Sequence, residues 1–283
     1  MAHIHWFPGH IAKAQRDLKE KLSLVDVVVE VLDARIPRAS AYKNVQNLIG
    51  NKSRLILLNK ADLSDEKYNK IWAQTIEQET CAPVIITDLN NQKDINTIID
   101  KIVEITNPIM LELLKKGLLP RAARSMVIGM PNVGKSSTIN RLIRKGKAKT
   151  GAKAGVTRQQ QWVRINRKVE LLDTPGIIPT TQDDQKQAIK LACVNSIGEN
   201  AYENEFVASE LLKLIEEAGY SDILKNYYKL EKETPATIEN IALSRNWIAK
   251  GAQPDTVRTA QFILTNFREG KIGRITLEKP PEQ

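Results

Sequence analysis

The sequence predicts an α/β domain with a mainly parallel sheet, followed by a second domain made only of helices. Four runs of β-branched and aliphatic residues, at 25–32, 54–58, 83–87 and 125–128, alternate with helical stretches. This alternation is typical of βαβ units in a parallel sheet. From about Asp183 onward, apolar residues recur only at three- and four-residue spacing, which predicts helices at 205–218, 238–250 and 255–268.

The other elements of the first domain follow from local signals. A turn-like opening, Trp6 to His10, precedes a charged helix in which Ile11 and Leu18 lie on one apolar face. The valine-rich strand at 25–32 ends at Asp33, because Pro37 prevents its continuation. Later elements are helices near 65–79, 92–105 and from about 130 to 144, a Gly-, Lys- and Ala-rich loop at 145–155, and strands at 160–165 and 168–172.

Length and composition restrict the class of protein. At roughly 100–200 residues per domain, 283 residues allow about two domains. We place the boundary at residue 180, with a first half at 1–105, a linker at 106–124, a second half at 125–180 and a helical domain at 181–283. No apolar run approaches the roughly 18 residues of a membrane span, so we expect a cytoplasmic protein without membrane association. Two distant cysteines, Cys81 and Cys193, argue against a zinc ribbon or disulfide scaffold.

The positive charge is concentrated in one stretch. The chain carries 42 Lys+Arg and 33 Asp+Glu, a formal net charge of +9. Residues 106–158 hold 12 of the basic residues and a single acid, Glu112, so the rest of the chain is nearly neutral. Such a concentration favours a polyanionic partner such as RNA, and the alternative is a solvated charged face.

Residues 129–136 match the P-loop pattern G-x-x-x-x-G-K-[ST] between a predicted strand and a predicted helix. In that pattern, backbone N–H groups enclose phosphate oxygens, Lys135 supplies charge to the β- and γ-phosphates, and the Ser136 hydroxyl binds Mg²⁺. The alternative is a chance glycine-rich turn. The predicted nucleotide-binding residues of this segment are Met130, Pro131, Asn132, Val133, Gly134, Lys135, Ser136 and Ser137.

Guanine recognition is predicted from Asn59-Lys60-Ala61-Asp62, which follows the strand at 54–58 as an N-K-x-D motif. A carboxylate at Asp62 can accept hydrogen bonds from N1–H and the exocyclic amine of guanine, a donor pair that adenine lacks. On its own the motif could be a helix N-cap. Thr87 and Asp88 end the next strand, where a guanine-supporting S-A-x element is expected, but they depart from that pattern.

Two further segments have the character of nucleotide switches. Asp173-Thr174-Pro175-Gly176 matches the element whose Asp holds Mg²⁺ and whose Gly N–H senses the γ-phosphate, although alone it would be a β-turn. Thr157 is the candidate switch-I residue that closes on Mg²⁺. Ile177 stands where Ras-type enzymes carry a water-orienting glutamine, so hydrolysis by the isolated protein is expected to be slow.

The N-K-x-D motif precedes the P-loop, the reverse of the usual order, which predicts a circularly permuted P-loop GTPase domain followed by a small all-helical C-terminal domain. Together with W-F-P-G-H at 6–10 and D-A-R-I-P at 33–37, these motifs resemble the bacterial ribosome biogenesis GTPase A family. The resemblance covers residues 1 to about 180, and the helical domain fits that family's C-terminal extension.

The resemblance implies a monomeric enzyme that uses GTP and Mg²⁺ in maturation of the large (50S) ribosomal subunit. It implies contact with rRNA, here through 106–158, with hydrolysis stimulated by the subunit and linked to release. It also implies a catalytic role for His10, beside Lys135 and Thr157, and K⁺ coordination by Asn132. The alternative for His10 is to cap or pack at the start of its helix, and the alternative for Asn132 is only to shape the P-loop. The competing functions are a P-loop metabolic kinase or ATPase, and an RNA-binding module with a vestigial nucleotide site.

Overall fold

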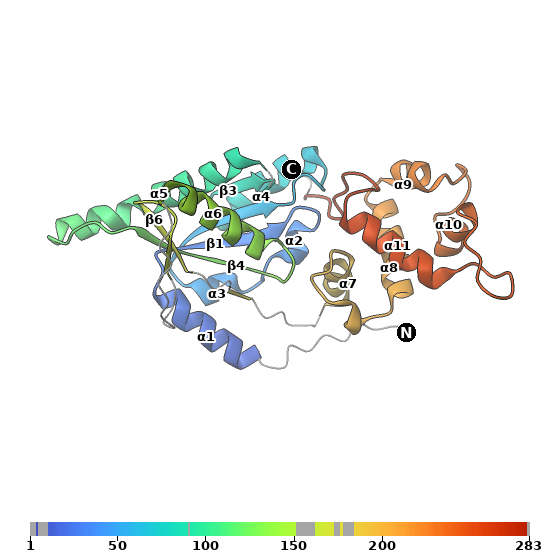
Figure 1. The fold of residues 1–283 in the computed structure, drawn as a ribbon, viewed down its shortest axis with the longest axis horizontal. Helices are drawn as coiled ribbons and strands as arrows, with labels where there is room; N and C mark the ends of the chain where they lie inside the picture. The colour runs from blue at the N-terminus through green and yellow to red at the C-terminus, as the bar shows by residue number, and fades with distance from the viewer. Residues whose placement is uncertain are drawn as a thin grey trace.

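A computed structural model describes Ile4 and residues 11–89, 91–150, 162–172, 176–177 and 184–281 (Figure 1). Within these residues, one sheet of seven strands has the order β3-β2-β1-β4-β6-β5, and β7 pairs with β4. Neighbouring strands are parallel except β5 and β6. The strands are β1 (Val27–Asp33), β2 (Ser53–Asn59), β3 (Val84–Thr87), β4 (Ala123–Gly129), β5 (Trp162–Arg164), β6 (Val169–Leu172) and β7 (Gly176–Ile177).

The central strand β1 is buried along all seven of its residues, as a parallel strand covered on both faces must be. Successive side chains alternate between the two faces of the sheet, and Leu32 packs with Trp72 and Ile76 of α4 in a third cluster. Val27, Val29 and Val31 belong to the core that includes α5 and α6, whereas Val28 packs with α1 and α3. The helices of this half are α1 (Ile11–Ser23), α2 (Pro37–Ser40), α3 (Val45–Ile49), α4 (Glu66–Thr80), α5 (Gln92–Lys115) and α6 (Lys135–Thr150).

The rest of the described chain is helical and lies at one end of the sheet (Figure 1). Its apolar residues, among them Leu191, Val207 and Ile263, join the same core cluster as Val29 and Leu57 of the sheet. The two regions therefore share one continuous apolar core. The helices are α7 (Gln185–Cys193), α8 (Asn204–Glu217), α9 (Ser221–Tyr228), α10 (Ile238–Ser244) and α11 (Thr256–Arg268), with a 3₁₀ turn η1 (Glu199–Ala201).

After α11 the chain returns to the first half, a path that the helical pattern did not anticipate. The Ile275 N–H donates to the Leu63 carbonyl (3.1 Å), and the Leu277 N–H donates to the Arg35 carbonyl (2.8 Å). The buried Trp72 indole donates to the carbonyl of Glu278 (2.9 Å). These contacts tie the C-terminal segment to the loops that follow β1 and β2.

Several predicted elements differ in extent from those observed. Helix α5 continues past residue 105 to Lys115, so the first part of the predicted linker is helical; Pro108 lies inside it. A proline removes one backbone hydrogen bond, and the cost is tolerated here because neighbouring turns continue the helix. Helix α6 likewise extends to Thr150, whereas α10 ends at Ser244 and the predicted helix at 238–250 is shorter than expected. None of the described helices is long and apolar enough to cross a membrane.

The return of the C-terminal segment predicts a stability defect in Glu278→Ala. This buried carboxylate accepts from the N–H groups of Arg38 (2.6 Å) and Ala39 (3.2 Å) at the start of α2, and from Lys190 (2.9 Å). Its loss leaves partly buried donors without an acceptor, so we expect the free energy of unfolding to fall by about 1–3 kcal/mol in urea titrations. Glu269→Ala, which removes only an exposed ion pair with Lys271, is the matched control and should leave the midpoint unchanged. Equal midpoints for the two variants would contradict the prediction.

Candidate nucleotide-binding site

The P-loop lies where β4 ends and α6 begins, at the carboxyl edge of the parallel sheet. Gly134 has a φ of +110°, and a Cβ there would come within 2.1 Å of the Asn59 Nδ2 atom. Gly129, with φ +150°, would similarly bring a Cβ within 2.6 Å of the Val31 carbonyl oxygen. The pattern therefore needs glycine at both positions because the loop passes directly over β1 and β2.

Asn59, the first residue of the N-K-x-D motif, joins that motif to the P-loop. Its amide nitrogen donates to the Val133 carbonyl (2.8 Å), and its side-chain oxygen accepts from the Thr87 hydroxyl (3.3 Å). All three residues are buried. Thr87 thus supports Asn59 from behind instead of lining the cavity, and the Ala61 N–H donates to the Thr87 carbonyl (3.2 Å).

Lys60 forms a second link between the two motifs. Its ammonium donates to the Asn132 carbonyl in the P-loop (2.7 Å) and to Asp33 Oδ2 at the end of β1 (2.8 Å). Burial alone would raise the pKa of Asp33, but the adjacent Arg35 and Lys60 cations hold it well below its usual range. Burial lowers the pKa of Lys60, and the Asp33 carboxylate opposes that shift. The backbone of Lys60 has a positive φ of 63°.

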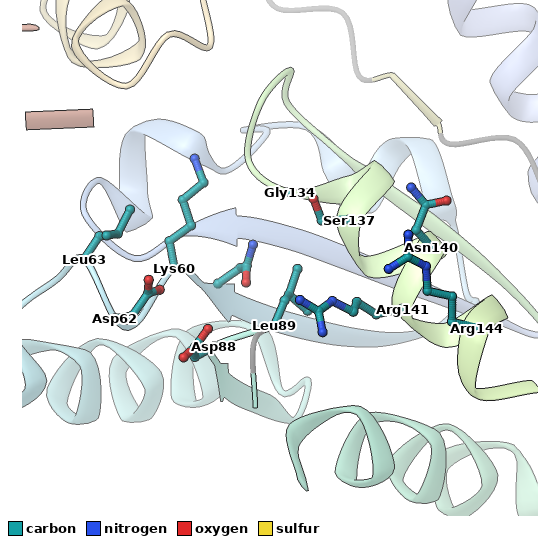
Figure 2. A pocket seen from close by; sticks show the side chains of 11 residues that line it. Lys60, Asp62, Leu63, Asp88, Leu89, Gly134, Ser137, Asn140, Arg141 and Arg144 are labelled. Atoms are coloured by element: carbon teal, nitrogen blue, oxygen red, sulfur yellow. The ribbon is translucent and has the colours of Figure 1, made fainter. Parts of the chain in front are cut away.

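A cavity of about 340 Å³ opens between these two motifs and α6 (Figure 2). Asp62 and Asp88 lie on one side, Arg141 and Arg144 extend from α6 on the other, and Leu89 lies between them. The size is in the range of small-molecule sites, and the mixture of carboxylates, cations and an aliphatic side chain suits a base attached to phosphates. The lining residues are Asn59, Lys60, Asp62, Leu63, Asp88, Leu89, Gly134, Ser137, Asn140, Arg141 and Arg144.

Lys135 is the first residue of α6 and is only 7% exposed. Its ammonium donates to the carbonyl of Met130, within the loop itself. Burial lowers the pKa of Lys135 to about 8, since no carboxylate among the described residues offsets the loss of hydration. The neighbouring Ser136 is exposed at the first turn of the helix. A buried ammonium and an exposed hydroxyl at a helix N-terminus can hold phosphate oxygens and a hydrated cation.

The other side of the P-loop contacts the helical region. The Asn132 side-chain amide donates to the Asn195 carbonyl (2.5 Å), and the Ser196 hydroxyl donates to the Pro131 carbonyl (2.7 Å). Both contacts come from the turn that follows α7. The loop predicted to hold phosphate is therefore fixed from both sides, by β2 and by the helical region.

Among the switch residues, Gly176 is placed by β7, whose pairing sets it beside Ile128 at the end of β4. The predicted residues His10, Thr157 and Asp173 lie outside the described residues. Sequence reasoning missed Leu63, Leu89 and Asn140 as cavity residues, and assigned Arg141 and Arg144 only to the basic stretch. A signal was present, since Asn140, Arg141 and Arg144 follow Ser137 by three, four and seven positions and so share its face of the helix.

The described part of the basic stretch is partly neutralised. Arg121 pairs with Asp26 (2.6 Å), and Lys115 pairs with Glu112 (2.8 Å). The Arg124 guanidinium lies 5.1 Å from the centre of the Trp162 ring. Arg141 and Arg144 line the nucleotide cavity, so part of the basic stretch lies at this site.

Comparison with known proteins decides the family. A family model described as "50S ribosome-binding GTPase" matches residues 124–241. Ribosome biogenesis GTPase A of Bacillus licheniformis is 38% identical over 282 residues, 99% of both chains. The chain belongs to the ribosome biogenesis GTPase A family. The same-named protein of Thermotoga maritima is 33% identical and covers 98% of this chain and 95% of its own.

Solved structures agree with this assignment. The GNP-bound YlqF from T. maritima has a TM-score of 0.66 at 30% identity, and covers 96% of this chain and 100% of that chain. A GDP-bound YlqF structure has a TM-score of 0.65 at the same identity, over 94% and 100%. This protein is thus a GTPase that binds guanine nucleotides, and its α/β fold is permuted: the family model begins at β4 and leaves out the half that carries Asn59 and Asp62.

The lowered pKa of Lys135 predicts that nucleotide affinity depends on pH. Phosphate favours the ammonium form, so binding takes up a proton wherever free Lys135 is deprotonated. The Kd for GDP should be nearly constant from about pH 6.5 to 7.5 and should rise above pH 8, by at most about tenfold per pH unit for one proton. Isothermal titration calorimetry in buffers of different ionisation enthalpy would measure both the Kd and the proton uptake.

Lys135→Arg is the control, because its guanidinium stays charged and any remaining pH dependence belongs to the nucleotide or to other groups. The same slope in both proteins would contradict the assignment to Lys135.

Proposed function

We propose that this GTPase assists maturation of the large (50S) ribosomal subunit, contacts rRNA through the basic stretch at 106–158, and couples hydrolysis to its release. One observation carries the nucleotide part: Asp62 and Gly134, from two motifs distant in sequence, line one cavity whose walls are joined by the Asn59–Val133 hydrogen bond. The ribosomal part is supported by the matching family description and by the names of the relatives. We further propose that it acts as a cytoplasmic monomer.

Within this site, Asp62 accepts the donor pair of guanine, and the P-loop with Lys135 binds the phosphates. Asn59, Lys60 and Thr87 hold the two motifs in register. The proposed nucleotide-binding residues are Asn59, Lys60, Ala61, Asp62, Thr87, Asp88, Met130, Pro131, Asn132, Val133, Gly134, Lys135, Ser136, Ser137 and Gly176.

Ser136 would hold Mg²⁺ together with Thr157 and Asp173. An exposed hydroxyl beside a buried lysine at the start of a helix fits this role, since oxygen ligands and a phosphate are what Mg²⁺ prefers. When bound, Mg²⁺ neutralises negative charge on the β- and γ-phosphate oxygens. Asn132 would bind K⁺ through its side-chain oxygen while its amide nitrogen remains on the Asn195 carbonyl.

Hydrolysis by the isolated protein is slow in this proposal, because Ile177 cannot orient water. We assign that role to His10, which the ribosomal subunit would order. A metabolic kinase or ATPase is disfavoured by the full-length similarity to GTPases, and a vestigial nucleotide site is disfavoured by the presence of both Lys135 and Ser136.

Asp62→Asn should change the base preference. An amide cannot accept both guanine donors, so GTP affinity should fall by about 10- to 100-fold, whereas xanthosine triphosphate, which carries an oxygen in place of the amine, should bind better than to wild type. Competition with a fluorescent GDP analogue measures both constants. Asp222→Asn, on α9 and not among the residues that line the cavity, is the control and should bind both nucleotides as wild type does. Unchanged discrimination in Asp62→Asn would remove Asp62 from the guanine site.

Purified large subunits should raise GTP turnover at least about tenfold in single-turnover assays, a change of about 1.4 kcal/mol in the barrier. Small subunits provide the control for unspecific RNA contact. His10→Ala should lose the stimulated rate but keep the Kd for GDP, because the proposed role of His10 concerns water and not nucleotide binding. Absence of stimulation by large subunits would reject the assembly-factor proposal, and full stimulation of His10→Ala would reject the role of His10 alone.

A further inference from the structure

We propose that Asp33 and Arg35 are positioning residues for Lys60, and that through them nucleotide affinity depends on docking of the C-terminal end of α11. The inference rests on the proposed function, because it takes Lys60 to be part of the nucleotide site. It adds a role for two residues that lie outside the nucleotide cavity and makes no use of a switch segment.

Asp33 is a buried carboxylate directly beside the N-K-x-D motif. It ends β1, and its register partner on β2 is Asn59. Its carboxylate is inaccessible to solvent. Oδ1 accepts from Arg35 Nε (2.9 Å), and Oδ2 accepts from both Arg35 Nη2 (2.8 Å) and Lys60 Nζ (2.8 Å). A carboxylate buried to this degree requires compensating cations, and both Arg35 and Lys60 supply them.

Arg35 is one of the largest fully buried side chains among the described residues. Its remaining terminal nitrogen, Nη1, faces the carbonyl oxygens of Phe267 (3.5 Å) and Arg268 (3.4 Å) in the last turn of α11. The guanidinium carbon lies 5.3 Å from the centre of the Phe267 ring. Carbonyl groups at a helix C-terminus carry partial negative charge, so docking of α11 stabilises the cation that holds Asp33.

Lys60 connects the Asp33 carboxylate to the P-loop. Lys60 divides its ammonium between Asp33 and the Asn132 carbonyl, and it does so from a backbone with positive φ, which is unfavourable for a lysine unless its surroundings hold it. Without Arg35, the buried Asp33 charge would be compensated by Lys60 alone. We expect the ammonium to move toward Asp33 and away from the P-loop, which loosens the loop and weakens nucleotide binding.

A second set of contacts brings the same end of α11 to the cavity wall. Gly270, just after the helix, has a φ of +73°, and a Cβ there would meet Leu63 Cδ2 at 2.6 Å. The Leu63 carbonyl also accepts from the Ile275 N–H (3.1 Å). Leu63 itself lines the nucleotide cavity next to Asp62. Docking of this end therefore supports the cavity at Leu63 and, through Arg35, at Lys60.

A double-mutant cycle tests the inference. The Kd for a fluorescent GDP analogue is measured for wild type, Arg35→Gln, Lys60→Ala and the double variant, with thermal unfolding of each protein recorded in parallel. We expect Lys60→Ala to weaken binding about tenfold and Arg35→Gln about fivefold, whereas the double variant should bind no more weakly than Lys60→Ala alone. A residue that acts only through the general stability of the fold would give additive losses.

Lys271→Gln is the matched control. Lys271 follows the same end of α11, but its exposed ammonium pairs with Glu269 (2.6 Å) and makes none of the contacts to Asp33. It should leave GDP affinity within about twofold of wild type. If Arg35→Gln does not fold, Arg35→Lys replaces it, because lysine keeps a cation beside Asp33 but cannot make the two-pronged pair or reach the helix carbonyls.

Linkage gives a second readout. If docking of α11 strengthens GDP binding, GDP must strengthen the docking by the same factor. Hydrogen exchange at the amides of the last turn of α11 should slow about fivefold with GDP in wild type and remain unchanged in Arg35→Gln. Additive losses in the cycle, equal weakening by Lys271→Gln, or GDP protection that persists in Arg35→Gln would each overturn the inference. An unaffected Kd in Lys60→Ala would instead contradict the proposed nucleotide site.

Discussion

The arrangement of this protein depends on one buried carboxylate. Asp33 lies in the interior at the end of the central strand, where its charge is tolerated only because Arg35 and Lys60 surround it. A buried ion pair adds little net stability compared with apolar packing, yet removing one partner from it is costly. Its effect is therefore to specify an arrangement: the loops after β1 and β2 and the end of α11 must all come together for the charge to be compensated.

The strand order explains why this position matters. β1 lies between β2, which leads into Asn59, and β4, which leads into the P-loop. In parallel sheets, ligands bind at the carboxyl ends of the strands, and the end of β1 lies between the N-K-x-D motif and the P-loop. Permutation changes the order in which these strands occur along the chain but leaves them neighbours in the sheet. The nucleotide site is thus conserved in space despite the reversed order of its motifs.

The motifs of the nucleotide site could be predicted from sequence more fully than the residues that hold those motifs in place. Gly134, Lys135 and Asp62 belong to short patterns whose spacing predicts a nucleotide site, and the structure brings Asp62 and Gly134 to one cavity. The alternation of strands and helices predicted the sheet. The D-A-R-I-P segment carried part of the family resemblance, but its sequence predicted no role for Arg35. The partners of Arg35 are carbonyl groups 232 and 233 residues away in sequence. Local patterns also could not foresee the return of the chain after α11, since it depends on tertiary contacts. They likewise missed the continuation of α5 past Pro108, where Leu111 and Leu114 are about half exposed and packing does not explain the helix.

The returning C-terminal segment has a consequence for synthesis of the chain. Residues 271–278 supply backbone partners to Leu63, Arg35 and Trp72, all of which are translated some 200 residues earlier. Until that segment has left the ribosomal exit tunnel, the loops after β1 and β2 lack these backbone partners. Helix α2 also lacks the Glu278 carboxylate at its N-terminus. A nascent chain that has not yet docked residues 271–278 should therefore lack the backbone partner of Leu63, and we expect its nucleotide cavity to be incomplete at that wall.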